Sequence, residues 1–270
     1  MLAEFSYRAP RSRDDLLALL VETAGGGRIM AGGTDLLVGI RDGLIRPAVV
    51  IDLKKVTGFD RLAFDPKSGL SIGPAVTISA LLESPVIRKK FPVLAAAASE
   101  LGSVQLRNRA TVIGNIVNAS PCADMAPPLL CLQASAIIAS PSGAREVMLA
   151  DFFAGVKKTV LKPGELLERI LVPAEMAGGR GGFMKLKRIK GHDLGIVSVA
   201  LFKQGRILRV AVGSAAPTPN HHPQLHPTAP AEKVCREALK AIKPIDDVRG
   251  TREYREFMVQ VFIKRLMKDN

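Results

Sequence analysis

Two glycine-bearing segments, about 80 residues apart, constrain this chain more than any other feature. The first spans residues 29–36 (IMAGGTDL) and the second residues 111–116 (TVIGNI), which is followed by NASP at 118–121. Glycine has no Cβ, so main-chain N–H groups beside it can approach an anion closely, and successive free N–H groups form a concave phosphate site. Asp124 lies nine residues after Asn115. Together these residues predict a pyrophosphate held from two sides and a polar contact to the rest of a nucleotide.

Composition indicates a globular protein of one large or two smaller domains. The chain has 270 residues, of which 47% are hydrophobic, enough for a substantial core. No apolar run is long enough for a membrane span, and the N-terminus lacks the basic and apolar regions of a signal peptide. The three cysteines show no metal-site or iron–sulfur spacing. We therefore expect a reducing cytoplasm, and any metal cluster on another chain.

The positive charge is concentrated in the last third of the chain. Residues 1–175 carry 20 Lys/Arg against 17 Asp/Glu, whereas residues 176–270 carry 18 against 8. Nucleic-acid binding is not expected, because aromatic residues make up only 4% of the chain and tryptophan is absent. Two interpretations of the basic third remain open: a solvated surface, or a surface that meets acidic protein partners.

Local patterns before residue 176 predict a mixed α+β domain. Ser12 is a candidate N-cap for the first helix, and Thr77 caps a later one. The sequence DPKSG at 65–69 and PSG at 141–143 indicate the turns of two β-hairpins. Helices are predicted at 11–23, 77–82, 92–101 and 127–133, and strands at 28–31, 49–53, 62–64, 70–72, 136–139, 145–149 and 166–172.

The remaining residues predict a small second unit. A glycine-rich linker is expected at 177–182, followed by a three-stranded antiparallel sheet (183–189, 196–202, 207–212) and two helices (232–242, 252–267). A proline-rich loop at 217–230 holds His221, His222 and His226. A solvent loop is favoured over a metal site there, because no Cys or carboxylate nearby completes a ligand set.

The order of several motifs resembles the FAD-binding subunit of the molybdenum hydroxylases. That family includes the medium subunit of carbon monoxide dehydrogenase and the FAD domain of xanthine dehydrogenase. The resemblance covers nearly the whole chain. It is carried by AGGTDLLV at 31–38, QLRNRATVIGNIVNASPCAD at 105–124, KLKR at 185–188, VSVA at 197–200, VGSAAPTP at 212–219 and PIDDVRG at 244–250.

The resemblance implies an α+β fold with an FAD-binding domain of the p-cresol methylhydroxylase type. FAD would lie between two α/β subdomains, about residues 1–55 and 56–175. Residues 176–270 would form a domain like the C-terminal domain of the carbon monoxide dehydrogenase flavoprotein, closing over the cofactor.

The family motifs imply a set of cofactor-binding residues, and none with a catalytic or metal-binding role. The two glycine segments would bind the pyrophosphate, with N–H donors from Gly32, Gly33, Thr34 and a turn at Gly114 and Asn115. The full set is Ile29, Met30, Ala31, Gly32, Gly33, Thr34, Asp35, Leu36, Leu101, Thr111, Ile113, Gly114, Asn115, Ser120, Asp124, Leu167 and Lys185.

Two of these residues have a specific predicted contact and a simpler alternative. Asp124 could accept a hydrogen bond from a ribose or ribityl hydroxyl, or could be a carboxylate at the start of a helix. Lys185 could place positive charge near the flavin N1–C2=O end, or could be a solvated strand residue. Gly32 and Gly33 alone would also suit an ordinary strand-to-helix turn.

The chain departs from the family pattern at two positions. The family usually has two glycines before the asparagine, where this chain has Ile113 and Gly114, and glycine before the threonine, where this chain has Ala110. A positive φ at Ile113 would strain the segment, and its side chain would crowd the phosphate and weaken FAD binding.

The function that the resemblance implies is an electron relay. FAD would carry electrons between an iron–sulfur small subunit, served by a molybdopterin large subunit, and an acceptor such as NAD or a quinone. Two alternatives stay open: a scaffold or regulatory protein that kept the fold and lost FAD, and a free-standing flavin oxidoreductase.

Overall fold

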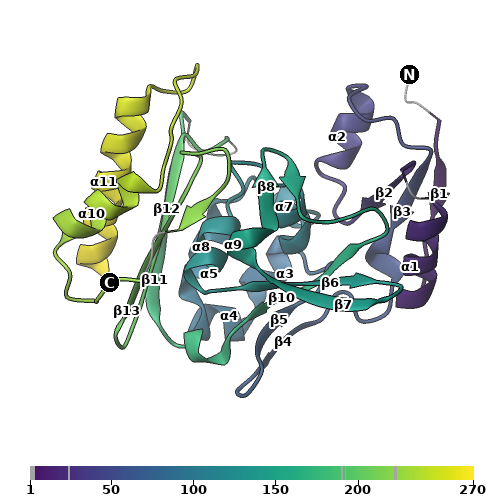
Figure 1. Cartoon of the computed structure of the whole chain (residues 1–270), viewed down its shortest axis with the longest axis horizontal. Helices are drawn as coiled ribbons and strands as arrows, with labels where there is room; N and C mark the ends of the chain where they lie inside the picture. The colour runs from purple at the N-terminus through teal and green to yellow at the C-terminus, as the bar shows by residue number, and fades with distance from the viewer. Residues whose placement is uncertain (1–3, 24, 190, 192, 222–223) are drawn as a thin grey trace.

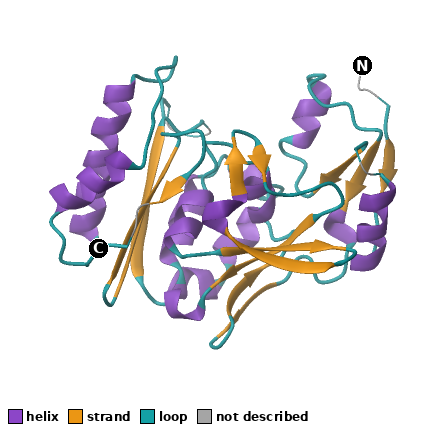
Figure 2. Cartoon of the chain, in the orientation of Figure 1, coloured by secondary structure: helices purple, strands orange, loops and turns teal. Residues whose placement is uncertain are grey.

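Three of the β-sheets formed by the described residues follow one another along the long axis of the molecule. The computed structural model describes residues 4–270 except 24, 190, 192, 222 and 223. In chain order, a three-stranded, a five-stranded and a four-stranded sheet run from right to left in Figure 1. Helices flank the sheets and lie between the middle and last ones (Figure 2). The predicted mixture of helices and sheets is confirmed.

The first sheet has three parallel strands in the order β1, β3, β2. Their bounds are Ser6–Arg8, Val49–Asp52 and Gly27–Met30. Helix α1 (Arg13–Glu22) begins where the sequence predicted, because the Ser12 hydroxyl accepts a hydrogen bond from the Asp15 N–H. Helix α2 (Leu36–Arg41) follows β2, and a 3₁₀ turn, η1 (Leu53–Lys55), follows β3. Both therefore start at the carboxyl edge of the same parallel sheet.

The second sheet is antiparallel, in the order β4-β5-β10-β6-β7. Both predicted hairpins, β4–β5 and β6–β7, are formed. A separate two-stranded hairpin, β8–β9, follows the sheet's last hairpin. The bounds are β4 (Leu62–Asp65), β5 (Gly69–Ile72), β6 (Ser135–Ser140), β7 (Gly143–Met148), β8 (Phe153–Gly155), β9 (Lys158–Thr159) and β10 (Leu166–Val172).

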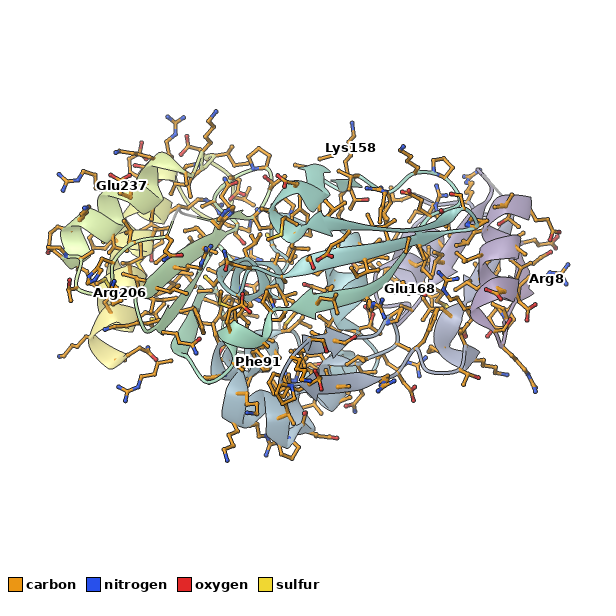
Figure 3. All side chains as sticks on the ribbon, turned by 60° about the horizontal axis from the view of Figure 1, so that its bottom comes forward. Arg8, Phe91, Lys158, Glu168, Arg206 and Glu237 are labelled. Atoms are coloured by element: carbon orange, nitrogen blue, oxygen red, sulfur yellow. The ribbon has the colours of Figure 1, made fainter. Side chains whose placement is uncertain are left out.

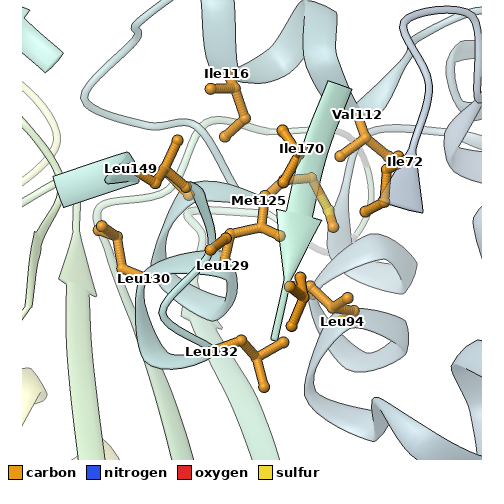
Figure 4. Packing of buried hydrophobic residues seen from close by; sticks show 14 of the residues in the cluster. Ile72, Leu94, Val112, Ile116, Met125, Leu129, Leu130, Leu132, Leu149 and Ile170 are labelled. Atoms are coloured by element: carbon orange, nitrogen blue, oxygen red, sulfur yellow. The ribbon is translucent and has the colours of Figure 1, made fainter. Parts of the chain in front are cut away.

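Helices α3 to α9 surround this sheet and share one large core with it. Their bounds are α3 (Ile78–Glu83), α4 (Pro85–Lys90), α5 (Pro92–Glu100), α6 (Val104–Arg107), α7 (Val112–Val117), α8 (Ala126–Cys131) and α9 (Leu149–Phe152). Figure 4 shows Leu129 of α8 and its N-cap residue Met125 near Ile170 of the central strand β10. The same core takes in Phe183 and Phe202 of the last sheet. The middle and last parts of the chain are thus packed against each other.

The last sheet is antiparallel, in the order β11-β12-β13-β14, and carries α10 and α11. The bounds are β11 (Arg180–Leu186), β12 (Val197–Gln204), β13 (Ile207–Gly213), β14 (Asn220–His221), α10 (Ala231–Lys240) and α11 (Arg252–Asp269), with a 3₁₀ turn η2 (Ala174–Met176) before them. The prediction of three strands was wrong, because the two residues of β14 pair with β13. A strand of two residues is too short to show an alternating pattern.

The predicted linker at 177–182 was also wrong in its second half. Residues 180–182 already belong to β11, and Gly181 pairs with Phe202. A Cβ added at Gly181 would lie 2.4 Å from the Leu201 carbonyl oxygen. These glycines permit a close approach between neighbouring strands. A glycine-rich sequence is equally typical of a flexible linker, so the sequence alone does not distinguish the two.

The first sheet is joined to the middle one through α1. Leu16, Leu17 and Leu20 of α1 share a buried cluster with Ala139 and Leu166 of the middle sheet. Arg13 also donates a hydrogen bond to Glu168 of β10, which is labelled beside α1 in Figure 3. The carboxyl edge of the first sheet is therefore held against the middle of the molecule.

Candidate functional site

The two glycine segments predicted to act together lie side by side. A Cβ added at Gly32 would lie 2.0 Å from the Arg109 carbonyl oxygen and 2.9 Å from the Ala110 Cα. A Cβ added at Gly114 would lie 3.9 Å from that of Ala31. Gly32 is therefore required for a close approach between two main-chain segments, and that approach brings residues 29–36 against the start of α7.

The first segment offers unpaired main-chain donors. Within the described residues, no acceptor pairs with the N–H groups of Gly32, Gly33 and Thr34. Gly33 has φ of 76°, which favours glycine. All three residues are partly buried. Free N–H groups cost free energy unless water or a ligand accepts from them, so the segment is suited to an anion. Ile29 and Met30 end β2, Asp35 precedes α2, and Leu36 begins it.

The second segment is a helix, and the prediction of a turn at Gly114 and Asn115 was wrong. Thr111 is the N-cap of α7, and its hydroxyl oxygen accepts from the Gly114 N–H at 3.0 Å. The Asn115 N–H donates to the Thr111 carbonyl. The N–H groups of Gly114 and Asn115, expected to bind phosphate, are thus occupied within the helix. The Thr111 hydroxyl hydrogen and the Asn115 side-chain amide remain as donors.

Ile113 has no strained backbone. It lies in the first turn of α7, it is absent from the residues with positive φ, and its side chain is buried in the main core. Leu101 and Leu167 are also buried in that core. These three residues therefore support the site through packing.

Asp124 and Lys185, 61 residues apart, form a buried ion pair. The Lys185 Nζ lies 2.8 Å from Asp124 Oδ2, and the two side chains are 2% and 9% exposed. Lys185 also donates to the Glu100 carbonyl at 3.4 Å. Burial raises the pKa of the Asp124 carboxyl above its usual range, and the Lys185 ammonium acts against that shift. Lys185 is therefore no solvated strand residue.

This ion pair is tied to the second segment. The Asn115 Oδ1 accepts a hydrogen bond from the Met125 N–H at 3.1 Å, which fixes the residue beside Asp124. Asp124 does not cap α8, whose N-cap is Met125. The Ser120 hydroxyl accepts from the Cys122 N–H and shapes the turn between α7 and Asp124. The structure thus brings Thr111, Asn115, Asp124 and Lys185 into one region.

Two residues that the sequence analysis did not predict join the first segment to the second. Asn118 donates from Nδ2 to Asp35 Oδ1 at 2.8 Å and accepts at Oδ1 from Lys157 Nζ at 2.8 Å. Lys157 and Ala119 both have positive φ, and the Lys157 N–H donates to the Ala119 carbonyl. Asn118 belongs to the motif at 105–124, which predicted no contact for it. No motif marks Lys157, because its contact depends on how hairpin β8–β9 lies against α7.

No candidate metal site is found among the described residues. They contain no group of three or more His, Cys, Asp or Glu side chains suited to a metal ion. His222, one of the three histidines of the predicted solvent loop, lies outside the described residues. No helix of the described part is both long and apolar enough to cross a bilayer.

Comparison with known proteins identifies the family. The FAD binding domain of molybdopterin dehydrogenases matches residues 3–175. The chain belongs to this family. It is 31% identical over 279 residues to the nicotine 6-hydroxylase medium subunit of Paenarthrobacter nicotinovorans, covering 98% of this chain and 96% of that one. It is 28% identical to the carbon monoxide dehydrogenase medium chain of Hydrogenophaga pseudoflava over 275 residues, covering 97% and 96%.

Solved structures agree with the family assignment. A chain of Cu,Mo-CO dehydrogenase superposes with a TM-score of 0.92 at 28% identity, covering 99% of this chain and 98% of that one. A chain of quinoline 2-oxidoreductase from Pseudomonas putida 86 gives 0.90 at 27% identity, covering 100% and 97%. The chain is an FAD-binding oxidoreductase subunit of the molybdenum hydroxylase family, and the expected cofactor, FAD, is confirmed.

Proposed function

We propose that this chain is the electron relay of a multi-subunit molybdenum hydroxylase. FAD, when bound, would supply the redox chemistry. Electrons would pass from a molybdopterin large subunit through an iron–sulfur small subunit to FAD, and from FAD to NAD or a quinone. The observation that carries the proposal is the set of free N–H groups at Gly32, Gly33 and Thr34, packed against the start of α7. An anion such as a pyrophosphate satisfies such donors.

Different residues of the site would bind different parts of FAD. Gly32, Gly33 and Thr34 would hold the pyrophosphate with main-chain N–H groups, and the side chains of Thr111 and Asn115 would add donors. The buried Asp124–Lys185 pair would lie toward the flavin or ribityl part, since it is joined to α7 through Asn115 and Met125. No residue of this chain is assigned as a catalytic acid or base.

The partners would be other chains of the same complex. Two relatives that match nearly the full chain are named as medium chain or medium subunit, which supports assembly into a larger enzyme. The basic residues of 176–270 supply a surface for acidic partners. The three free cysteines suit a reducing cytoplasm.

The structure removes the main reason for the alternative of an FAD-free scaffold. That alternative was motivated by Ile113, which was expected to strain the second segment, whereas Ile113 is an ordinary helical residue. A free-standing flavin oxidoreductase differs from the proposal only in needing no partner chains.

The test is purification of the chain from its natural source without prior reconstitution. We expect flavin absorbance, release of FAD on denaturation, and co-purification of a molybdopterin chain and an iron–sulfur chain. Colourless protein that gains no flavin absorbance with added FAD would refute FAD binding. Flavoprotein that purifies alone from a native extract would instead favour the free-standing oxidoreductase.

A further inference from the structure

A lysine outside all the predicted site residues contacts the first glycine segment. Lys54 lies in η1, directly after β3, and its Nζ donates to the Ala31 carbonyl oxygen at 3.0 Å. The same Nζ lies 2.7 Å from Asp52 Oδ1. Its side chain is 29% exposed, so neighbouring residues cover most of it. Parallel strands β2 and β3 bring the two segments to the same sheet edge.

The position of Lys54 is itself fixed by a buried carboxylate. Asp52 accepts at Oδ1 from both the main-chain N–H and the Nζ of Lys54, and at Oδ2 from the Tyr7 hydroxyl at 2.6 Å. Burial acts to raise the pKa of Asp52, but hydrogen bonds from Lys54 and Tyr7 lower it below its usual range. The carboxylate is therefore ionised at neutral pH and holds the ammonium in one place.

The contact decides the direction of a predicted phosphate donor. A trans peptide is planar, so its C=O and N–H point in opposite directions. With its carbonyl held by Lys54, the peptide between Ala31 and Gly32 must direct the Gly32 N–H away from Lys54. That N–H is among the donors without a partner in the described residues. Fixing it beforehand removes an ordering cost from ligand binding.

We propose that Lys54, held by Asp52, is a positioning residue that orients the Gly32 N–H toward the FAD pyrophosphate. The proposal rests on the proposed function. Lys54 would act through the Ala31–Gly32 peptide, and Asp52 and Tyr7 would act through Lys54.

The matched control is the next residue. Lys55 carries the same charge, lies in the same 3₁₀ turn and is exposed. Lys54→Met should lower the affinity of the full-length apoprotein for FAD and for ADP by about two- to twelvefold, the range expected for one lost hydrogen bond. Lys55→Met should change neither affinity, and Lys54→Arg should restore most of the loss. Hydrogen exchange at residues 31–36 should quicken in Lys54→Met and stay unchanged in Lys55→Met.

Asp52→Asn separates positioning from simple charge attraction. It removes a negative charge near the site, so charge alone predicts tighter FAD binding, whereas loss of positioning predicts weaker binding. Tyr7→Phe should weaken it slightly in the same direction. Titrations run well below each variant's melting temperature, so that a weaker fold does not imitate weaker binding.

The outcomes distinguish failure of the proposed function from failure of the positioning role of Lys54. Wild-type protein that binds neither FAD nor ADP would refute the proposed function and this inference with it. Wild-type protein that binds FAD while Lys54→Met matches Lys55→Met, or Asp52→Asn that binds more tightly, would overturn the inference and leave the proposed function intact.

Discussion

Removing Asp124 should cost far more stability than the loss of one hydrogen bond. The Lys185 ammonium is 2% exposed, and its contacts are Asp124 Oδ2 at 2.8 Å and the Glu100 carbonyl at 3.4 Å. Asp124→Ala leaves that charge buried with only the longer contact. Breaking a buried ion pair on one side typically costs about 3–5 kcal/mol. For a chain of this size, that corresponds to a fall in melting temperature of roughly 6–10 °C.

The double variant provides the decisive control. Asp124→Ala with Lys185→Met removes both charges, so no uncompensated ion remains in the interior. Lys185→Met should therefore stabilise the Asp124→Ala background, although it destabilises the wild type. Differential scanning calorimetry of the four apoproteins measures this coupling. If the two single losses simply add in the double variant, the ion pair does not have the energetic role assigned to it.

The same variants test the cofactor contact of Asp124. Bound FAD raises the melting temperature in proportion to the logarithm of its affinity. If Asp124 also accepts a hydrogen bond from a cofactor hydroxyl, Asp124→Ala should lower the affinity for FAD about two- to twelvefold, in addition to its effect on the stability of the apoprotein. Equal melting shifts with and without FAD would restrict Asp124 to its ion pair with Lys185.

Four further predictions follow from the site and its supports. FAD should be bound non-covalently, so acid precipitation should leave the flavin in the supernatant; flavin retained in the pellet would contradict this. Association with the partner chains should slow as salt rises, since the Debye length falls from about 8 Å at physiological salt to about 3 Å at 1 M; a rate independent of salt would mean that the basic surface is merely solvated. Gly32→Ala should disrupt folding or FAD binding severely, because its Cβ would lie 2.0 Å from a carbonyl oxygen, whereas Gly26→Ala, whose Cβ would meet only the Ala48 Cβ at 3.4 Å, should be mild; equal melting temperatures would refute the close approach. Arg249 lowers the pKa of Asp247 to about 2, so Asp247 should contribute stability that is present above about pH 4 and is lost as pH falls toward 2, and Asp247→Asn should flatten this part of the melting profile.

Local chemistry made much of the fold predictable. Helix starts at Ser12 and Thr77 rest on side chains that cap their own N-termini. The two hairpins rest on turn residues between apolar strands, and both were found in the expected places. These features depend on neighbours in sequence, so a single sequence contains them.

The contacts that the site residues make were harder to predict than the proximity of the two glycine segments. The two glycine segments lie side by side, as expected, but the second proved to be a capped helix. Thr111 followed three residues later by Gly114 was the available signal, since an N-cap threonine accepts from the third N–H of its helix. The Asp124–Lys185 pair had no such signal, because the packing of α8 against the last sheet places the two charges together.

The departure at Ile113 shows where such a site does and does not need glycine. Any residue except proline supplies an N–H, so glycine is required only where φ is positive or a Cβ has no room. Gly32 meets the second condition and Gly33 the first. Ile113 meets neither, because it is helical and its side chain is buried in the core. Replacing glycine with isoleucine there removes no donor and adds buried apolar surface, which stabilises the helix that supports the site.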